Sequence, residues 1–98
     1  MKFVVTFQPI ASADVAEAFS WYEEQRVGLG AEFEADVGRA VRLLEGMAAA
    51  GPVAYRGLRR ILLHQFPFAV YYKLTGSAVD VRGVVHTRQH PRSWRRRA

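Results

Sequence analysis

The sequence has 98 residues, the size of one domain, and half of them are hydrophobic. That composition can fill one core and excludes a disordered chain. Because there is no cysteine, disulfide frameworks, thiol nucleophiles and cysteine-bound zinc are excluded too. The apolar runs are too short to cross a bilayer, and the start of the chain alternates like a strand rather than a secretion signal. We expect a single cytoplasmic domain over residues 1–98, with no membrane contact, metal or cofactor.

Charge is distributed unevenly along the chain. Residues 1–50 carry four cationic and eight acidic side chains, a net charge of −4. Residues 51–98 carry nine arginines and one lysine against one aspartate, a net charge of +9. A surface this basic attracts nucleic acid, anionic membrane or an acidic protein segment. The alternative is an excess that only keeps the chain soluble, but arginine predominates, and its planar fork suits carboxylates and phosphates.

The first half predicts one strand and two helices. Residues 3–8 alternate, with Phe3, Val5 and Phe7 on one face. A helix is expected over about residues 13–25, capped by Ser12 or Asp14. After two glycines, a second helix is expected over about residues 31–49. It has the clearest 3.6-residue period of the sequence, in a stripe comprising Phe33, Val37, Ala40, Val41, Leu44, Met47 and Ala48.

The second half predicts three antiparallel strands and a basic tail. The strands are expected over residues 58–64, 66–74 and 78–86, with the tail over 87–98. A helical hairpin can cover one face of such a sheet, so the other face is expected to stay partly open. Alternation in the last strand places Val79, Val81 and Val85 on one face and Arg82 and His86 on the other, open one.

Four segments of the chain carry a resemblance to a known family. They are residues 7–18, 21–33, 55–72 and 84–91. The most specific parts are the strand Phe66-Pro67-Phe68 running to Tyr71-Tyr72, and the terminal pattern of His86, Arg88 and Pro91. In order and spacing these segments resemble the RelE/ParE toxin superfamily of type II toxin–antitoxin systems. The branch they resemble is ParE-like, whose members are often called plasmid stabilisation proteins.

The resemblance implies an α+β fold of order β-α-α-β-β-β, with the helical hairpin on a small antiparallel sheet and a basic C-terminal tail. It also implies an acidic antitoxin that folds on binding and through which operator DNA is reached only indirectly, and a homodimer within the assembly is conceivable. ParE members inhibit DNA gyrase by protein–protein contact and arrest growth. RelE members cleave mRNA on the ribosome. The fold alone does not decide between these activities.

An mRNA endoribonuclease would need a base, an acid and cations for the phosphate. In this sequence those roles would fall to His86 with Arg60 and Arg88. Strand parity does not tell whether Arg60 shares a face with His86. The chain has only two lysines and no tyrosine after Tyr72, whereas RelE-like nucleases usually have a lysine-rich cluster and a late tyrosine. His86 and His90 have no carboxylate nearby, which argues against a metal site.

The preferred hypothesis is therefore a ParE-type toxin that binds gyrase, with no catalytic residue of its own. A third hypothesis is a degenerate toxin that only binds its antitoxin. Trp21 lies off the buried stripe of its helix, so it either packs on the second helix or forms an exposed patch for the antitoxin or a second copy of the chain. A second such patch is expected at Tyr71, because Tyr71 and Tyr72 face opposite sides of their strand and one must leave the core. The residues expected to contact the target or antitoxin are Arg59, Arg60, Arg82, His86, Arg88, Trp94, Arg95, Arg96 and Arg97.

Overall fold

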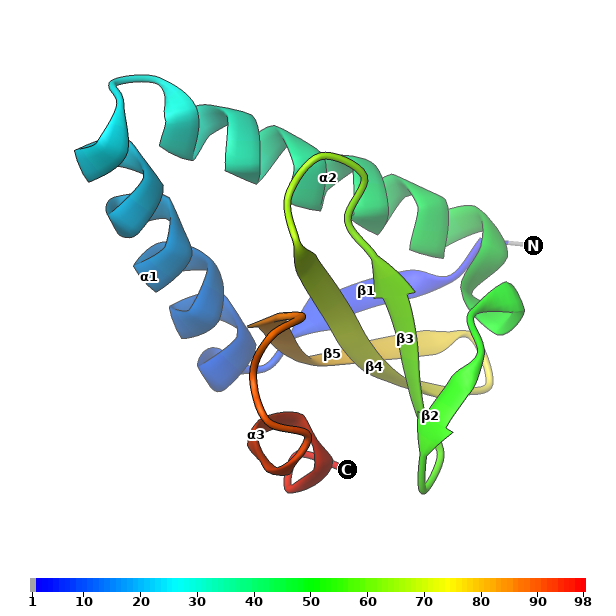
Figure 1. Cartoon of the computed structure of the whole chain (residues 1–98). Coiled ribbons are helices and arrows are strands. Elements are labelled where there is room, and N and C mark those ends of the chain that lie inside the picture. The colour runs from blue at the N-terminus through cyan, green and yellow to red at the C-terminus, as the bar shows by residue number, and fades with distance from the viewer. Residues whose placement is uncertain (1) are drawn as a thin grey trace.

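A computed structural model describes residues 2–98 and shows two helices and a short tail packed on the two faces of one sheet (Figure 1). The sheet has five strands in the order β1-β5-β4-β3-β2. β1 pairs with β5 in parallel, and the other neighbours are antiparallel. The elements are β1 Val4–Phe7, α1 Pro9–Gln25, α2 Leu29–Met47, the 3₁₀ turn η1 Ala48–Ala50, β2 Val53–Tyr55, β3 Leu58–Leu62, β4 Phe68–Thr75, β5 Ala78–His86 and α3 Arg92–Arg95.

Two features of this topology differ from the prediction. β2 was not predicted, because three residues after a proline carry too little alternation to mark a strand. The sheet is mixed rather than purely antiparallel, since β1 joins it as an edge strand that runs parallel to β5. β5 itself spans the predicted residues 78–86. No helix within residues 2–98 is long and apolar enough to cross a membrane.

The helical hairpin begins and turns differently from the prediction. α1 starts at Pro9 rather than near residue 13, and its N-cap makes no side-chain hydrogen bond, so the predicted caps Ser12 and Asp14 are wrong. Proline suits the first helical position because its missing N–H needs no partner there. At the α1–α2 corner the Glu23 carboxylate accepts the N–H groups of Gly28 and Gly30 at 2.9 and 3.0 Å. A side chain of α1 thus satisfies the free N–H groups at the start of α2.

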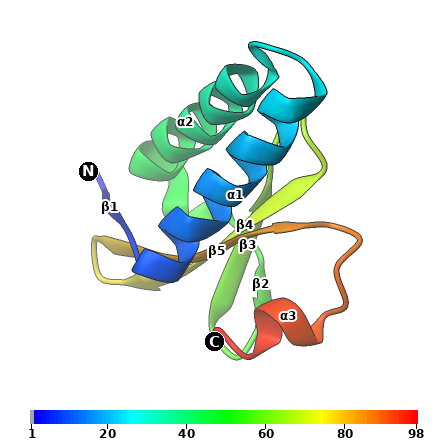
Figure 2. The same cartoon turned by 90° about the vertical axis from the view of Figure 1, so that its left-hand side faces the viewer.

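The main core lies between this hairpin and the sheet, on what we call the helix side (Figure 2). Phe33 is fully buried there, in contact with Tyr22, Phe66 and Phe68 through ring centroids 5.0–5.5 Å apart. The stripe predicted for α2 is buried apart from Val41, which is partly buried, and Met47 at the end of the helix, which is 57% exposed. The 3.6-residue period therefore identified the buried face of α2 but not where the helix leaves the sheet.

A buried carboxylate holds the loop between β3 and β4. Asp36 of α2 is 6% exposed and accepts the N–H groups of His64, Gln65 and Phe66 at 3.1, 2.7 and 3.0 Å. Desolvation by burial raises the pKa of Asp36, but these three donors and the guanidinium of Arg39 more than offset it, so its pKa lies below the ordinary value. Asp36 therefore connects the hairpin to the strands as an ionised group.

A bulge in β5 reverses which side chains face the helices. Tyr72 pairs with Val81 while Tyr71 pairs with Gly83, which leaves Arg82 as the extra residue. Val81 and Val84 therefore both reach the helix-side core, and Val85 faces the other side. The prediction that Val85 shares a face with Val79 and Val81 is wrong, because one inserted residue shifts every later side chain to the opposite face.

The second face of the sheet is covered rather than open. A smaller core on this side, the tail side, comprises Leu58, Ala69, Tyr71, Val85 and Trp94. Figure 2 shows α3 packed on the face opposite the hairpin. Tyr71 is only 2% exposed, so the predicted outward patch at Tyr71 is wrong. Both tyrosines of the Tyr71-Tyr72 pair are buried, each in a different core.

The β2–β3 hairpin contains a strained arginine that provides a first test of this fold. Arg56 and Gly57 form a two-residue loop with φ of 47° and 77°, as a type I′ turn requires. A left-handed backbone costs an ordinary L-residue about 1 kcal/mol or more, whereas asparagine adopts it readily. We expect Arg56→Asn to raise the free energy of unfolding by about 1 kcal/mol. Urea unfolding checks this, with Arg60→Asn in the adjacent strand as the contrasting change that should not stabilise.

Candidate partner-binding site

The C-terminal segment is fastened to the tail side by one tryptophan. Trp94 stacks on Tyr71 with ring centroids 4.7 Å apart and an interplanar angle of 13°, and it is 9% exposed. The rings of Tyr55 and Trp94 also meet edge-to-face, with their centroids 6.4 Å apart. Burial of an indole is a large stabilising contribution for so short a helix. Trp94 therefore positions the arginines around it, while its own ring is covered.

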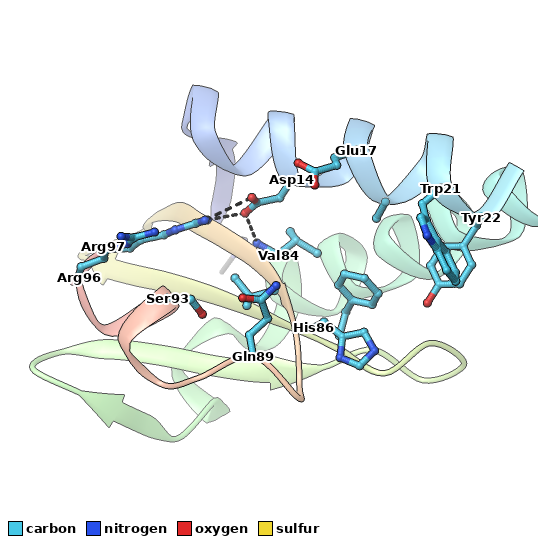
Figure 3. A pocket seen from close by; sticks show the side chains of 13 residues that line it. Asp14, Glu17, Trp21, Tyr22, Val84, His86, Gln89, Ser93, Arg96 and Arg97 are labelled. Carbon is cyan, nitrogen blue, oxygen red and sulfur yellow. Dashed lines mark hydrogen bonds and ion pairs between the residues drawn. The ribbon is translucent and has the colours of Figure 1, made fainter. Parts of the chain in front are cut away.

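The same segment is fastened a second time at the free edge of β5. β1 ends opposite Val81, so β5 has no neighbour there beyond that residue. Asp14 of α1 accepts the N–H of Val84 at 2.9 Å and forms an ion pair with Arg97 (Figure 3). Arg97 also donates to the carbonyl oxygen of Arg82 at 3.3 Å, and Arg82 donates to that of Arg97 at 3.1 Å. Asp14, Arg82 and Arg97 thus close the exposed edge of the strand.

A pocket of about 590 Å³ opens between α1, the end of β5 and the tail (Figure 3). We call it the α1–β5 pocket. Trp21, 57% exposed, stands at one end of it and Arg96 and Arg97 line the other. Two of its lining residues hold buried polar atoms, Ser93 Oγ and Arg97 Nε, that make no hydrogen bond within residues 2–98. The remaining lining residues are Asp14, Glu17, Ala18, Tyr22, Phe68, Val84, Val85, His86 and Gln89.

His86 lies at the rim of this pocket in a fixed orientation. Its ring packs on Phe68 with centroids 5.2 Å apart, and its Nδ1 accepts the N–H of Arg88 at 3.0 Å. An imidazole that accepts through Nδ1 carries its proton on Nε2 when neutral. The exposed nitrogen of His86 is therefore a donor, which suits a hydrogen bond to a partner and does not suit proton abstraction.

The residues named for a nuclease lie on different sides of the sheet. Arg60 is paired with Tyr71, which belongs to the tail-side core. His86 is paired with Phe68, which packs against the helix-side core. Residues directly opposite each other in a sheet point to the same face, so Arg60 and His86 point to opposite faces. The structure also contains no group of three His, Cys, Asp or Glu residues able to hold a metal within residues 2–98.

Comparisons with known proteins identify this architecture. No family model matches the sequence, and no curated protein matches it. Among solved structures, a chain from the "Chromosomal ParDE TA system from P. aeruginosa" superimposes with a TM-score of 0.77 at 18% sequence identity. The match covers 87% of this chain and 96% of that chain. The chain has a RelE/ParE-like fold. The resemblance inferred from the sequence is thereby confirmed for the fold.

Within the RelE/ParE-like fold, three of the predicted surface arginines serve the structure itself. Arg59 donates to the carbonyl oxygens of Ala49 and Gly51 at 3.1 and 2.6 Å, which ties β3 to the end of α2. Arg82 pairs with Asp80 at 2.7 Å, and Arg97 pairs with Asp14. Of the arginines predicted to make contacts, those left exposed and without an ion pair in the described residues are Arg60, Arg88, Arg95 and Arg96.

The RelE/ParE-like fold also gathers cations that sequence analysis did not single out. A second hollow of about 590 Å³, which we call the basic hollow, lies between the β2–β3 turn, β4 and the tail. The turn consists of Arg56 and Gly57, which both have a positive φ. An arginine followed by glycine between two strand-like segments is the sequence signal that could have predicted this turn. The hollow is lined by Tyr55, Arg56, Lys73, His90, Arg92, Arg95, Arg96 and Ala98.

The ion pair at the β5 edge can be tested with one substitution. Asp14→Asn keeps an oxygen that can accept the Val84 N–H but removes the charge opposite Arg97. Because both side chains are mostly buried, we expect a loss of about 1–3 kcal/mol in the free energy of unfolding and faster amide exchange at residues 84–98. Glu17→Gln, one turn along the same helix, removes the same charge without a partner. Equal effects of the two changes would contradict a specific role for Asp14.

Proposed function

We propose that this chain is the toxin of a type II toxin–antitoxin system and that it acts by binding another protein. The observation that carries the proposal is the match to the ParDE chain over 87% of this chain and 96% of that chain. That structure is named for a toxin–antitoxin system, and the match extends over nearly all of both chains. We further propose DNA gyrase as the target, as in the ParE-type toxins that the sequence resembles.

The geometry of the histidine supports binding rather than RNA cleavage. His86 offers a donor nitrogen at the pocket rim, and Arg60 points to the opposite face of the sheet. A cleavage site needs its base, acid and phosphate-binding cations within reach of one phosphodiester. His86, Arg60 and Arg88 therefore act in this proposal as separate contact or structural residues.

The α1–β5 pocket is the proposed contact site for the antitoxin or the target. Trp21 offers a large exposed aromatic surface beside it, and such residues dominate binding energies when they become buried at an interface. Arg96 at the opposite end supplies a cation for an acidic partner.

Two assays with the purified chain test the function. In a gyrase supercoiling reaction we expect loss of supercoiled product, and in a coupled translation reaction with mapped mRNA ends we expect no new cuts. An acidic antitoxin, to be sought among the products of neighbouring genes, should restore supercoiling. Codon-positioned mRNA cuts without gyrase inhibition would instead identify a RelE-type endoribonuclease. Binding of that acidic protein with neither effect would identify a toxin that has lost its activity.

One substitution tests the contact site within the same assays. Trp21→Ala should weaken binding of the target or of the antitoxin at least tenfold, the loss of about 1.4 kcal/mol or more typical of an interface hot spot. Met47→Ala is the matched control, because Met47 is also 57% exposed but lies at the far end of α2. Unchanged affinity of Trp21→Ala for both proteins would remove the pocket from the proposal.

A further inference from the structure

The basic hollow holds five cationic side chains that form no ion pair within residues 2–98. They are Arg56, Lys73, Arg92, Arg95 and Arg96, and no aspartate or glutamate lines the hollow. The ion pairs within residues 2–98 involve other cations, namely Arg26, Arg39, Arg82 and Arg97. Like charges gathered around one concave surface repel one another, so an anion that enters the hollow is strongly favoured.

Two of the cations of the hollow, Arg56 and Arg95, are held by aromatic rings before any ligand arrives. Arg56 and Arg95 each lie over the ring of Tyr55 with guanidinium carbons 5.1 Å from its centroid, and Arg95 also lies 5.5 Å from that of Trp94. Arg56 occupies a turn position where asparagine or glycine is normally preferred. Strain kept at a position that presents a charge points to use of that charge in binding.

The character of the hollow selects among anionic partners. An acidic peptide that folds on binding needs apolar anchors, but Trp94 and Tyr71 are buried and guanidinium groups lie over Tyr55. Single-stranded nucleic acid is usually held by stacking of bases on free aromatic faces, which are also lacking here. The phosphate backbone of duplex DNA needs neither feature, because arginine and lysine contacts alone hold it.

We infer that the basic hollow binds the phosphate backbone of duplex DNA without regard to sequence. This inference goes beyond the proposed toxin function, in which DNA is reached only through the antitoxin, and it does not depend on a protein target. Arg56 from the β2–β3 turn and Arg92 from α3 contact phosphates of the duplex. Lys73, Arg95 and Arg96 add to the same field.

Binding of the chain alone to a labelled 20-base-pair duplex of arbitrary sequence tests the inference. Fluorescence anisotropy should give a dissociation constant of about 10⁻⁴–10⁻⁶ M near physiological salt, with the logarithm of affinity falling linearly with that of salt concentration. The double substitution Arg56→Gln and Arg92→Gln should lower the magnitude of that slope by about 2, since each phosphate contact contributes roughly 1. A second duplex of unrelated sequence should behave identically.

Controls separate a site from net charge. Lys2→Gln with Arg42→Gln removes two exposed cations outside the hollow, and its slope should stay close to that of the unmodified chain. Arg56→Asn should reduce the slope by about 1 while raising the unfolding midpoint, which excludes misfolding as the cause. Equal losses from both double variants would overturn the inference, as would tighter binding of a polyglutamate peptide or of single-stranded RNA than of the duplex at the same salt. Gyrase inhibition plays no part in these outcomes.

Discussion

Asp36→Ala is expected to reduce the free energy of unfolding by about 3–5 kcal/mol, the largest loss we expect from any one polar side chain. The substitution leaves the N–H groups of His64, Gln65 and Phe66 without their acceptor, and hydrogen bonds to a charged group are worth about 1.5–3 kcal/mol each. Phe66 belongs to the aromatic core under α2, so loosening this loop also disturbs packing around Phe33. Urea denaturation followed by far-ultraviolet circular dichroism measures the change.

Protonation of the Asp36 carboxylate at low pH should also destabilise the fold. Because the pKa of Asp36 is lower in the folded chain than its ordinary value of 3.8, its stabilising effect is fully present above that value. It is lost as the pH falls through the lower folded value. The unmodified chain should therefore lose stability progressively below about pH 4, and the Asp36→Asn variant should show a shallower loss over that range.

A neighbouring carboxylate provides the control for Asp36. Glu34 lies two residues earlier on α2 and is exposed, so Glu34→Ala should change the free energy of unfolding by no more than about 0.5 kcal/mol. If Asp36→Ala were as mild as Glu34→Ala, the three backbone hydrogen bonds would not be what holds the loop. Asp36→Asn should fall between the two, because its amide oxygen still accepts but carries no charge.

Trp94→Ala is expected to release the tail and, with it, one wall of the partner-binding site. Truncation of a buried aromatic side chain costs about 3–5 kcal/mol of packing. α3 has only four residues and cannot keep its place without that contact. We expect residues 87–98 to become sensitive to trypsin while the sheet and hairpin stay folded. Target or antitoxin affinity should drop at least tenfold as Ser93, Arg96 and Arg97 leave the pocket.

Trp21→Ala distinguishes loss of the tail from loss of a contact. It should reduce partner affinity without any increase in proteolysis of residues 87–98, because Trp21 lies on α1 and is largely exposed. Trp94→Phe should restore most of the resistance to trypsin, since phenylalanine can still stack on Tyr71. Full partner affinity of a Trp94→Ala chain with a released tail would place the site elsewhere on the molecule.

Sequence patterns were sufficient to predict those helices and strands whose formation depends mainly on residues close together in the chain. The 3.6-residue period of α2 was read correctly for most of its length and the bounds of β5 were predicted, because each reports a pattern within one segment. The alternation predicted for β5 holds only as far as the bulge at Arg82. The charge difference between the halves likewise predicted a basic surface in the second half. α1 was placed four residues late, since Asp14 has the residue type of an N-cap but is used elsewhere.

The site depended on pairings that no single segment contains. Asp14 meets Val84 and Arg97 only because β1 ends short of the exposed half of β5. The bulge at Arg82 turned His86 toward the helices and Val85 toward Trp94. Period-2 alternation holds along an unbroken ladder, and one extra residue set by the register with β4 reverses it.

The sequence by itself determined three features: a buried apolar face on α2, the extent of the last strand and a second half rich in arginine. Only the tertiary structure decided which arginines are free to bind a partner. Arg97 pairs with Asp14 and Arg82 with Asp80, while Arg59 donates to the carbonyl oxygens of Ala49 and Gly51. The physical reason is distance. Charge pairing and burial depend on groups up to 83 residues apart in the chain, whereas sequence periodicity reports only on the segment that carries it.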